Sequence, residues 1–308
     1  MKHLKIITLL ITVVFIQVHS FSQVTYSKKM QNVVYGMVSG TALLMDIYMP
    51  ITSNHKAILF IPGSAWGFPY SLDYDQTPLK EDVLLDSNYT GKWVHSLVQN
   101  GYTVCVINHR FSPRYHYNEI IEDCRRAVRY VRYNANELDI DPDHIGAMGH
   151  SSGANLASML GVSDDNQSYT HSSVDSVSAK VQAVVTLAAP FNLADINRSG
   201  DTAIVNDYIL SAISAYMGSL PEMKAGVFIL SGKYKEASPF AQVTKDDAPT
   251  LIYNSDNDPL IPIRQANDMY HQLIENNVPT QMIISQHTGH NPIPDMRIVC
   301  KWFDKYLH

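Results

Sequence analysis

The chain has little cysteine, and it lacks the short motifs that accompany bound metals and nucleotides. Its 308 residues include three cysteines, and no two of them form a C-x-x-C pair. Widely separated cysteines signal neither a disulfide framework nor a zinc site. The motifs H-E-x-x-H and G-x-G-x-x-G are also missing, so we expect no metal and no organic cofactor. Cys105, Cys124 and Cys300 each fall on an apolar stripe, which favours buried free thiols.

Charge of either sign is also scarce. Charged residues make up 17% of the chain, and the formal net charge is −6. This balance gives no reason to expect nucleic acid or an anionic membrane as a partner, and it leaves the oligomeric state open. We find no internal repeat, and no low-complexity segment beyond a polar stretch at residues 163–178. The composition is ordinary for a soluble enzyme.

Long apolar runs are missing except near the N-terminus. Two lysines and an apolar run at residues 6–18 precede the small residues Ser20 and Ser22. This order is typical of a secretory signal peptide. The run is too short for a membrane anchor, which needs roughly 20 apolar residues. We therefore expect residues 1–22 to be a signal peptide, and residues 23–308 to be exported, periplasmic or extracellular, as one domain without a membrane span.

Shorter apolar runs recur along the rest of the chain. Continuous runs of this length are typical of strands buried on both faces of a parallel sheet. Before them, residues 32–50 alternate apolar and polar side chains around Ser39 and Gly40, which predicts an antiparallel hairpin at one edge of the sheet. The expected buried strands are residues 56–62, 102–108, 144–149, 181–189, 250–254 and 280–285.

Helical patterns separate these runs. In residues 118–132, five apolar residues fall on one helical face. Alternation of strands and helices predicts an α/β fold, a doubly wound, mostly parallel sheet with helices on both faces. Residues 191–247 interrupt the alternation, and the helical piece at 207–217 predicts a small cap insertion. The other expected helices are residues 92–100, 154–160, 264–275 and 295–307.

The sequence G-H-S-S-G lies where one expected strand ends and a helix begins. In this context G-x-S-x-G predicts a tight turn in which Gly149 and Gly153 must lack side chains. The central Ser151 is then held in a strained conformation with its hydroxyl projecting, and Ser152 offers a backbone amide at the helix N-terminus. The competing interpretation is a glycine-serine helix cap. Strand and helix context favours Ser151 as a nucleophile.

A serine nucleophile needs a base and an acid, which in this architecture follow later strands in the order acid, then histidine. Asp256 and Asp258 follow the strand that ends at residue 254, and the prolines after Asp258 favour it over its neighbour. His287 and His290 follow the last strand. Gly289 gives His290 the freedom to turn inward, so we predict His290 as the base, with His287 as the alternative.

A second oxyanion donor is expected in the loop after an earlier strand. The residues P-G-S-A-W follow the run at 56–62, and Ser64 and Ala65 are small enough for their amides to approach a substrate carbonyl. Trp66 would then line the substrate pocket. A Pro-Gly turn above a core tryptophan explains the same residues.

Together these segments resemble the α/β-hydrolase superfamily. The likeness covers residues 33–308, and the acetyl-esterase and feruloyl-esterase branch, related to hormone-sensitive-lipase-like carboxylesterases, looks closest. That branch usually has His-Gly-Gly-Gly/Ala-Trp in the oxyanion loop, where this chain has Pro62 to Trp66, and a second glycine where it has Ala154. The resemblance implies that Ser151, Asp258 and His290 act as nucleophile, acid and base.

The resemblance and the expected export imply a short acyl ester, acetyl or feruloyl, on a carbohydrate. An amidase or peptidase on the same fold is the alternative, and a non-catalytic binding protein, which would lack a triad member, is a third. Loop tyrosines form a candidate platform for a sugar or an aromatic acid, or merely cover the sheet. They are Tyr70, Tyr74, Tyr89, Tyr115 and Tyr117.

Overall fold

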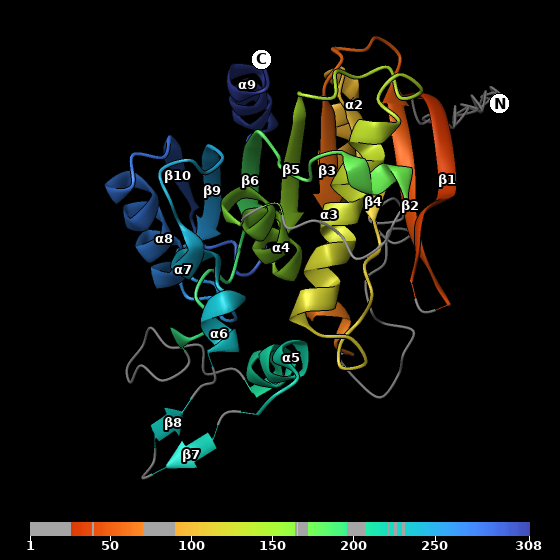
Figure 1. Ribbon diagram of the computed structural model, residues 1–308. Coiled ribbons are helices and arrows are strands. Elements are labelled where there is room, and N and C mark those ends of the chain that lie inside the picture. Colours follow the sequence, from red (N-terminus) through yellow and green to blue (C-terminus); the bar gives the residue numbers. More distant parts are fainter. Residues whose placement is uncertain are drawn as a thin grey trace, which may run out of the picture.

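The computed structural model places one central sheet between two layers of helices (Figure 1). The eight strands have the order β1-β2-β4-β3-β5-β6-β9-β10. β1 and β2 are antiparallel to their neighbours, and every later neighbouring pair is parallel. The structure describes residues 26–38, 40–69, 90–163, 165, 172–195, 207–220, 222–224, 227–229 and 232–308.

The strands agree closely with the apolar runs of the sequence. Tyr26–Val38 and Thr41–Pro50 form the expected hairpin, although its first strand is much longer than the alternation indicated and contains irregular register steps. The bounds are β1 Tyr26–Val38, β2 Thr41–Pro50, β3 Ala57–Ile61, β4 Thr103–Ile107, β5 Ile145–His150, β6 Ala183–Leu187, β9 Thr250–Ser255 and β10 Thr280–Ser285.

Helices cover both faces of this sheet. α3 and α4 pack on one face with α8, and α2 and α9 pack on the other (Figure 1). The bounds are α2 Thr90–Gln99, α3 Tyr117–Tyr133, α4 Ser152–Val162, α8 Ile263–Glu275 and α9 Met296–Tyr306, with short 3-10 helices η1 Ala65–Gly67 and η3 Ser173–Ser176.

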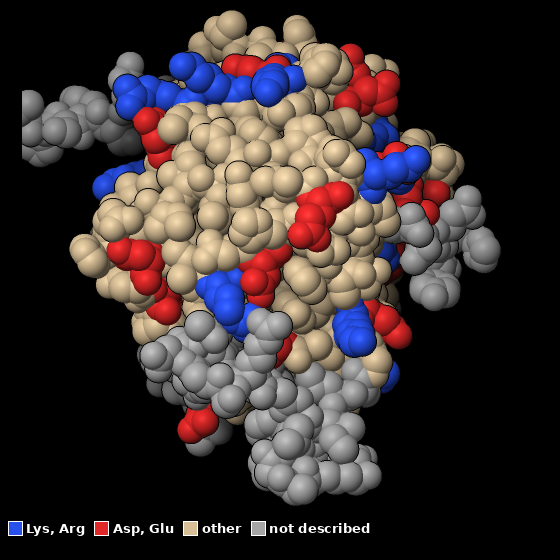
Figure 2. All heavy atoms as spheres, turned by 90° about the vertical axis from the view of Figure 1, so that its left-hand side faces the viewer, with Lys and Arg blue, Asp and Glu red and all other residues tan. Residues whose placement is uncertain are grey.

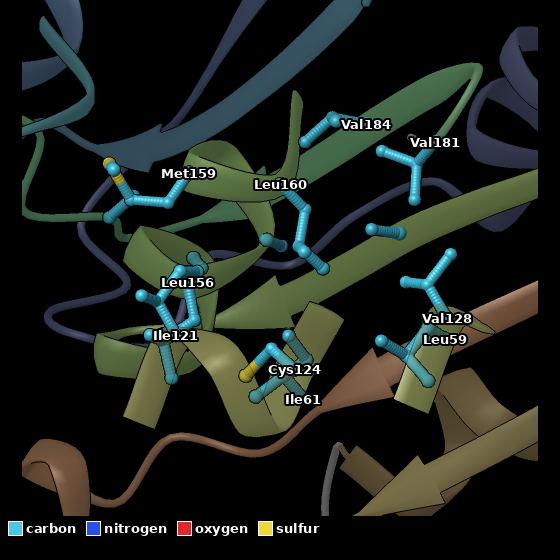
Figure 3. Close-up of a cluster of buried hydrophobic side chains, with 14 of the residues drawn as sticks. Leu59, Ile61, Ile121, Cys124, Val128, Leu156, Met159, Leu160, Val181 and Val184 are labelled. Carbon is cyan, nitrogen blue, oxygen red and sulfur yellow. The ribbon is translucent and has the colours of Figure 1, made fainter. Parts of the chain in front are cut away.

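Alternate residues of each central strand enter opposite core layers. In β3, Leu59 and Ile61 face the α3 and α4 layer, whereas Ile58 and Phe60 face α2 and α9. Figure 3 shows the first of these layers, where Leu59 and Ile61 lie with side chains of α3, α4 and β6. Burial on both faces explains why these strands read as continuous apolar runs.

β10 differs from that expectation. Its side chains are mostly half-buried, because β10 is the last strand of the sheet and has a neighbour on one side only. The edge carrying β10 and α8 faces the viewer in Figure 2, where the described charged side chains, of both signs, lie mostly around a broad uncharged area. An apolar run therefore locates a strand but does not say whether the strand is central.

The three thiols are buried, as predicted. Cys105, Cys124 and Cys300 are free cysteines. Burial raises the pKa of Cys105 to about 12 and that of Cys300 to about 11, which keeps both thiols protonated near neutral pH. They pack as small apolar side chains.

The chain between β6 and β9 contains the predicted helix at residues 207–217. α5 packs on the loop after β3, since Tyr208 Oη donates to the Phe68 carbonyl at 3.2 Å. A two-stranded hairpin and two single-turn helices in the same stretch were not predicted from the sequence. The bounds are α5 Asp207–Met217, β7 Glu222–Lys224, β8 Val227–Ile229, α6 Lys233–Glu236 and α7 Pro239–Gln242.

Candidate active site

Ser151 occupies the turn between β5 and α4 in a conformation that L-residues rarely adopt. Its φ is +52° and its ψ is −124°. Such a backbone costs on the order of 1–3 kcal/mol and persists only where its surroundings fix it. Here the Ser151 amide donates to the Leu187 carbonyl at 2.8 Å, while its carbonyl accepts from Ala154 and Asn155. The turn therefore projects the Ser151 side chain at the C-terminal end of the sheet.

Three glycines leave room for this turn. A methyl group on Gly149 would meet the Gly153 carbonyl, and one on Gly153 would meet the Ile61 carbonyl. One on Gly63 would lie 2.6 Å from His150 Nδ1 and 3.0 Å from Ser151 Cβ. The loop after β3 and the nucleophile turn thus touch through backbone, as G-x-S-x-G predicts for its own two glycines.

A chain of hydrogen bonds joins the serine to an acid through a histidine. His290 Nε2 lies 2.8 Å from Ser151 Oγ. His290 Nδ1 lies 2.7 Å from Asp258 Oδ2. The structure therefore brings together the three side chains that the sequence analysis selected.

Two backbone amides hold the Asp258 carboxylate in place. The Asp258 side chain is fully buried, and its Oδ1 accepts from the amides of Leu260 and Ile261 at 2.8 and 2.9 Å. These bonds occupy one carboxylate oxygen and leave the other aimed at His290. A buried carboxylate with all its acceptors satisfied is the arrangement that orients an imidazole and stabilises its charged form.

The alternative acid and base lie elsewhere and contact each other. Asp256 Oδ1 accepts from the His287 amide at 2.7 Å, and the His287 side chain is 80% exposed. Next to them, Asn257 Oδ1 accepts from the Gly289 amide at 2.9 Å, with Gly289 at φ +61°. These bonds join the loop after β9 to the loop after β10. Asp256 and His287 therefore help to hold the two loops together, and we call this pair the brace.

The structure reduces the candidate oxyanion donors from three backbone amides to two. The Ser64 amide donates to Ser152 Oγ at 3.0 Å, so this amide already has an acceptor. Ala65, the residue after Ser64, has a positive φ of +48°, so the chain turns there. Of the three amides considered, those of Ala65 and Ser152 remain as candidate donors, and Ser152 begins α4, where the helix dipole favours negative charge.

Trp66 does not form an open wall of a pocket. Its side chain is 2% exposed, its Nε1 donates to Asn155 Oδ1 at 3.2 Å, and its ring stacks on Tyr216 of α5 at 4.5 Å. Asn155 in turn donates to the Pro190 carbonyl at 2.9 Å. The structure thus places Trp66 in the core beneath the oxyanion loop, which is the alternative interpretation of this tryptophan.

The tyrosines of the suggested sugar platform are only partly covered by the structure. Tyr70, Tyr74 and Tyr89 lie outside the described residues. Tyr115 packs under the Arg110 guanidinium at 4.9 Å, and Tyr117 packs edge-on against Tyr216 at 5.9 Å. Both described tyrosines are committed to neighbouring side chains, which supports the reading that they cover the sheet.

One residue of the site was not selected from the sequence. His150 is buried, and its Nε2 lies 3.0 Å from the carbonyl oxygen of His290. The centroids of the His150 and His290 rings are 5.2 Å apart, and the centroid of the Trp93 ring lies 5.9 Å from that of His150. The variable position of G-x-S-x-G was the available signal, but no local pattern connects it to a residue 140 positions away.

The described helices include none that is both long and apolar enough to cross a membrane. Within the same residues, no three or more His, Cys, Asp or Glu side chains form a group suited to a metal ion.

Fold and site together define an α/β-hydrolase. The sheet order, the strained serine turn after β5 and the histidine after the last strand are its features. Within this superfamily the chain belongs to the BD-FAE family, whose model matches residues 45–273.

Individual relatives agree with this assignment. The chain is 24% identical over 242 residues to the probable carboxylic ester hydrolase LipM of Mycobacterium tuberculosis, covering 76% of this chain and 49% of that protein. It spans about half the length of the curated relatives LipM and LipC. Among solved structures, a truncated form of a carbohydrate esterase from gut microbiota is 26% identical, with a TM-score of 0.74, covering 92% of this chain and 98% of that one.

A more distant structure shows the same fold. The acetyl ester-xyloside bifunctional hydrolase of Caldicellulosiruptor lactoaceticus has a TM-score of 0.63 at 20% identity, covering 92% of this chain and 95% of that one.

Proposed function

We propose that this chain is an exported serine carboxylesterase that hydrolyses short acyl esters, acetyl or feruloyl, of carbohydrates. The observation that carries the proposal is the hydrogen-bonded chain from Ser151 Oγ through His290 to the buried carboxylate of Asp258. The names of LipM and of the gut carbohydrate esterase support the bond type and the kind of alcohol. The basic, then apolar, then small order of residues 1–22 supports export.

Acylation begins with Ser151. His290 Nε2 takes the hydroxyl proton as Ser151 Oγ attacks the ester carbonyl, and a tetrahedral intermediate forms. Asp258 keeps the Nδ1 proton of His290 in place and stabilises the imidazolium. Because the Asp258 side chain is already satisfied by two amides, it holds this orientation without reorganising.

The oxyanion of the intermediate is held by backbone amides. In the proposal these are the amides of Ala65 and Ser152, the latter at the N-terminus of α4. His290 then gives its proton to the leaving alcohol oxygen, and the acyl group stays on Ser151. A water molecule repeats the sequence with His290 as base, which releases the acid and restores the serine.

The test is hydrolysis of p-nitrophenyl esters of rising acyl length and of acetylated and feruloylated sugars by the wild type and by Ser151→Ala. We expect the variant to lose at least about a thousandfold in kcat on the best ester while keeping its circular dichroism spectrum and melting temperature. A fluorophosphonate probe should label the wild type on the peptide that contains Ser151.

Two results would remove the assignment. If the wild type hydrolyses aminoacyl p-nitroanilides and none of the esters, the site belongs to an amidase. If a folded wild type hydrolyses neither class and the probe does not label Ser151, the chain is a binding protein on a hydrolase scaffold.

A further inference from the structure

The oxyanion loop after β3 contains three successive residues with positive φ. The φ angles are +48° at Ala65, +56° at Trp66 and +79° at Gly67. Gly67 adopts such a backbone freely, whereas Ala65 and Trp66 carry side chains that make it unfavourable. A strained backbone of this kind persists only where its surroundings fix it. The contacts around the loop therefore decide whether the Ala65 amide keeps its direction.

α4 supplies two of these contacts. The Ser64 amide donates to Ser152 Oγ at 3.0 Å, and Trp66 Nε1 donates to Asn155 Oδ1 at 3.2 Å. Ser64 and Trp66 are the two neighbours of Ala65 in the chain. The helix that follows the nucleophile turn therefore holds the loop on both sides of this residue.

α5 supplies two further contacts. The Tyr216 ring stacks on the Trp66 ring, with the centroids 4.5 Å apart and the planes within 10° of parallel. Tyr208 Oη donates to the Phe68 carbonyl at 3.2 Å, directly after the strained residues. α5 belongs to the insertion between β6 and β9, and it lies below the sheet and its two helical layers in Figure 1. The insertion therefore contacts the loop at its strained centre and at its end.

The Tyr216 side chain contacts other side chains of the core and is not open to a substrate. It is buried, and Tyr117 packs edge-on against its ring at 5.9 Å. Its hydroxyl has no hydrogen-bond partner among the residues that the structure describes. Any effect of Tyr216 on the site therefore comes from its ring and passes through Trp66.

We propose that α5 helps to build the oxyanion hole, and that Tyr216 is the positioning residue through which the insertion keeps the Ala65 amide directed at the oxyanion. This inference rests on the proposed esterase function. Without the Tyr216 ring, Trp66 loses its stacking partner, and the strained residues are free to relax in a way that turns the Ala65 amide away. The oxyanion forms only when Ser151 attacks, so the loss falls on the tetrahedral intermediate and not on binding of the ester.

The test combines kinetics on the best p-nitrophenyl ester with inhibition by a trifluoromethyl ketone. Ser151 Oγ adds to the ketone carbonyl carbon, the serine proton passes to His290, and the carbonyl oxygen becomes an oxyanion. The inhibition constant therefore reports on the oxyanion hole.

We expect Tyr216→Leu to lower kcat about thirtyfold with KM within about twofold of the wild type, since loss of a whole oxyanion donor costs roughly a hundred- to thousandfold. The inhibition constant should rise by a similar factor. The apparent pKa in the pH profile of kcat/KM should keep its wild-type value, because the contact between His290 and Asp258 is untouched.

Three further variants separate the ring from the hydroxyl and from a general loss of stability. Tyr216→Phe keeps the stacked ring and should have the wild-type kcat and inhibition constant. Tyr102→Leu removes an equally buried ring from the other core layer, directly before β4, and should lower the melting temperature without changing either value. Tyr208→Phe removes the donor to the Phe68 carbonyl and should shift both values about threefold in the same direction as Tyr216→Leu.

The results distinguish this inference from the proposed function. A wild type that hydrolyses none of the esters ends the proposed function and removes the basis of the inference. With an active wild type, the inference is overturned by a folded Tyr216→Leu whose kcat and inhibition constant stay within about twofold of the wild type. A change confined to KM, or an equal loss of kcat in Tyr102→Leu, also overturns it. If Tyr216→Leu does not fold, wild-type values for Tyr208→Phe overturn it, and each of these results leaves the esterase assignment standing.

Discussion

His150 and His290 are held together through a side chain and a backbone carbonyl. Nε2 of His150 lies 3.0 Å from the His290 carbonyl oxygen, beside the bond from His290 Nε2 to Ser151 Oγ. His150 immediately precedes Ser151, so this contact sets the distance between the strand that carries the serine and the loop that carries the histidine. We interpret His150 as a positioning residue.

Removing this contact should slow catalysis without weakening binding. We expect His150→Phe to lower kcat about tenfold with KM nearly unchanged, since one hydrogen bond contributes on the order of 1 kcal/mol. His150→Gln keeps an amide donor and should recover part of the loss. His271→Phe, at an exposed position on α8, is the control and should have wild-type kinetics. Equal kcat values for the Phe and Gln variants would contradict a role for the donated bond.

The two aspartates after β9 should differ sharply. Asp258→Asn is expected to lower kcat about ten-thousandfold, because an amide favours the wrong tautomer of His290. Asp256→Asn, which removes charge from the brace beside it, should change kcat less than about fivefold. Steady-state kinetics on the best p-nitrophenyl ester compare kcat between the two variants. The reverse order would make Asp256 the acid.

Ser152 is expected to matter through its hydroxyl as well as its amide. Ser152→Ala leaves the Ser64 amide without its acceptor and frees the oxyanion loop, so we expect kcat to fall about five- to tenfold. Ser158→Ala on the same helix is the matched control, because the Ser158 hydroxyl is equally buried but has no hydrogen-bond partner among the residues that the structure describes. Identical kcat values for the two variants would show that the Ser64 amide does not depend on Ser152.

Stability should depend strongly on one buried ion pair. Asp123 receives bonds from Nε and Nη2 of Arg110 and from the Arg110 amide, at 2.8–3.0 Å, and both side chains are buried. Asp123→Asn leaves the Arg110 guanidinium with only the more distant Glu119 carboxylate, 3.9 Å from Nη1, as a charged partner, and should lower the free energy of unfolding by about 3–5 kcal/mol. Urea unfolding at pH 7 measures this loss. Asp295→Asn, in the exposed pair with Arg297, should leave the urea midpoint unchanged.

Stability should also fall in mild acid because of His109. Burial lowers the pKa of His109 from 6.5 to about 4, although a bond to the Arg110 carbonyl acts in the opposite direction. Between these two pH values the unfolded chain binds a proton that the folded chain excludes. The stability that goes with a neutral His109 is therefore fully present above pH 6.5. As the pH falls from 6.5 towards 4, the free energy of unfolding decreases, by about 3 kcal/mol at full extent.

Comparison with a variant isolates this histidine from other groups. Burial also lowers the pKa of His95, so the wild type has more than one source of acid sensitivity. The difference in unfolding free energy between pH 7 and pH 4.5 should be smaller in His109→Asn than in the wild type. An unchanged difference would show that His109 takes up its proton without unfolding.

Local pattern was sufficient for most of the fold. Apolar runs predicted β3, β4, β5 and β9 to within one or two residues, because burial on both faces gives each strand a run of mainly apolar residues. The same rule overstated the burial of β10, whose position at the edge depends on the order of strands in space. The β7–β8 hairpin was missed for the related reason that two strands of three residues carry almost no periodicity.

The site was predictable where a local rule applied. Gly289 and the prolines after Asp258 distinguished each selected residue from its neighbour, and the structure places the selected pair, His290 and Asp258, in contact. The environments of Trp66 and His150 depend on partners far away in the sequence, Tyr216 and the His290 carbonyl. No pattern within a single segment contains that information.

The bonds between the loops after β9 and β10 divide the site into two mechanical parts. Asp258 and His290 sit in one part, braced by Asn257 and Gly289, and Ser151 sits in the other. The two parts are joined by the bond from His290 to Ser151 and by the bond from His150 to the His290 carbonyl, so we expect thermal motion between them to lengthen these two bonds before it disturbs the bond from His290 to Asp258. On warming, activity should fall before the sheet unfolds. It should return at once on cooling, because a lengthened contact between Ser151 and His290 re-forms without refolding.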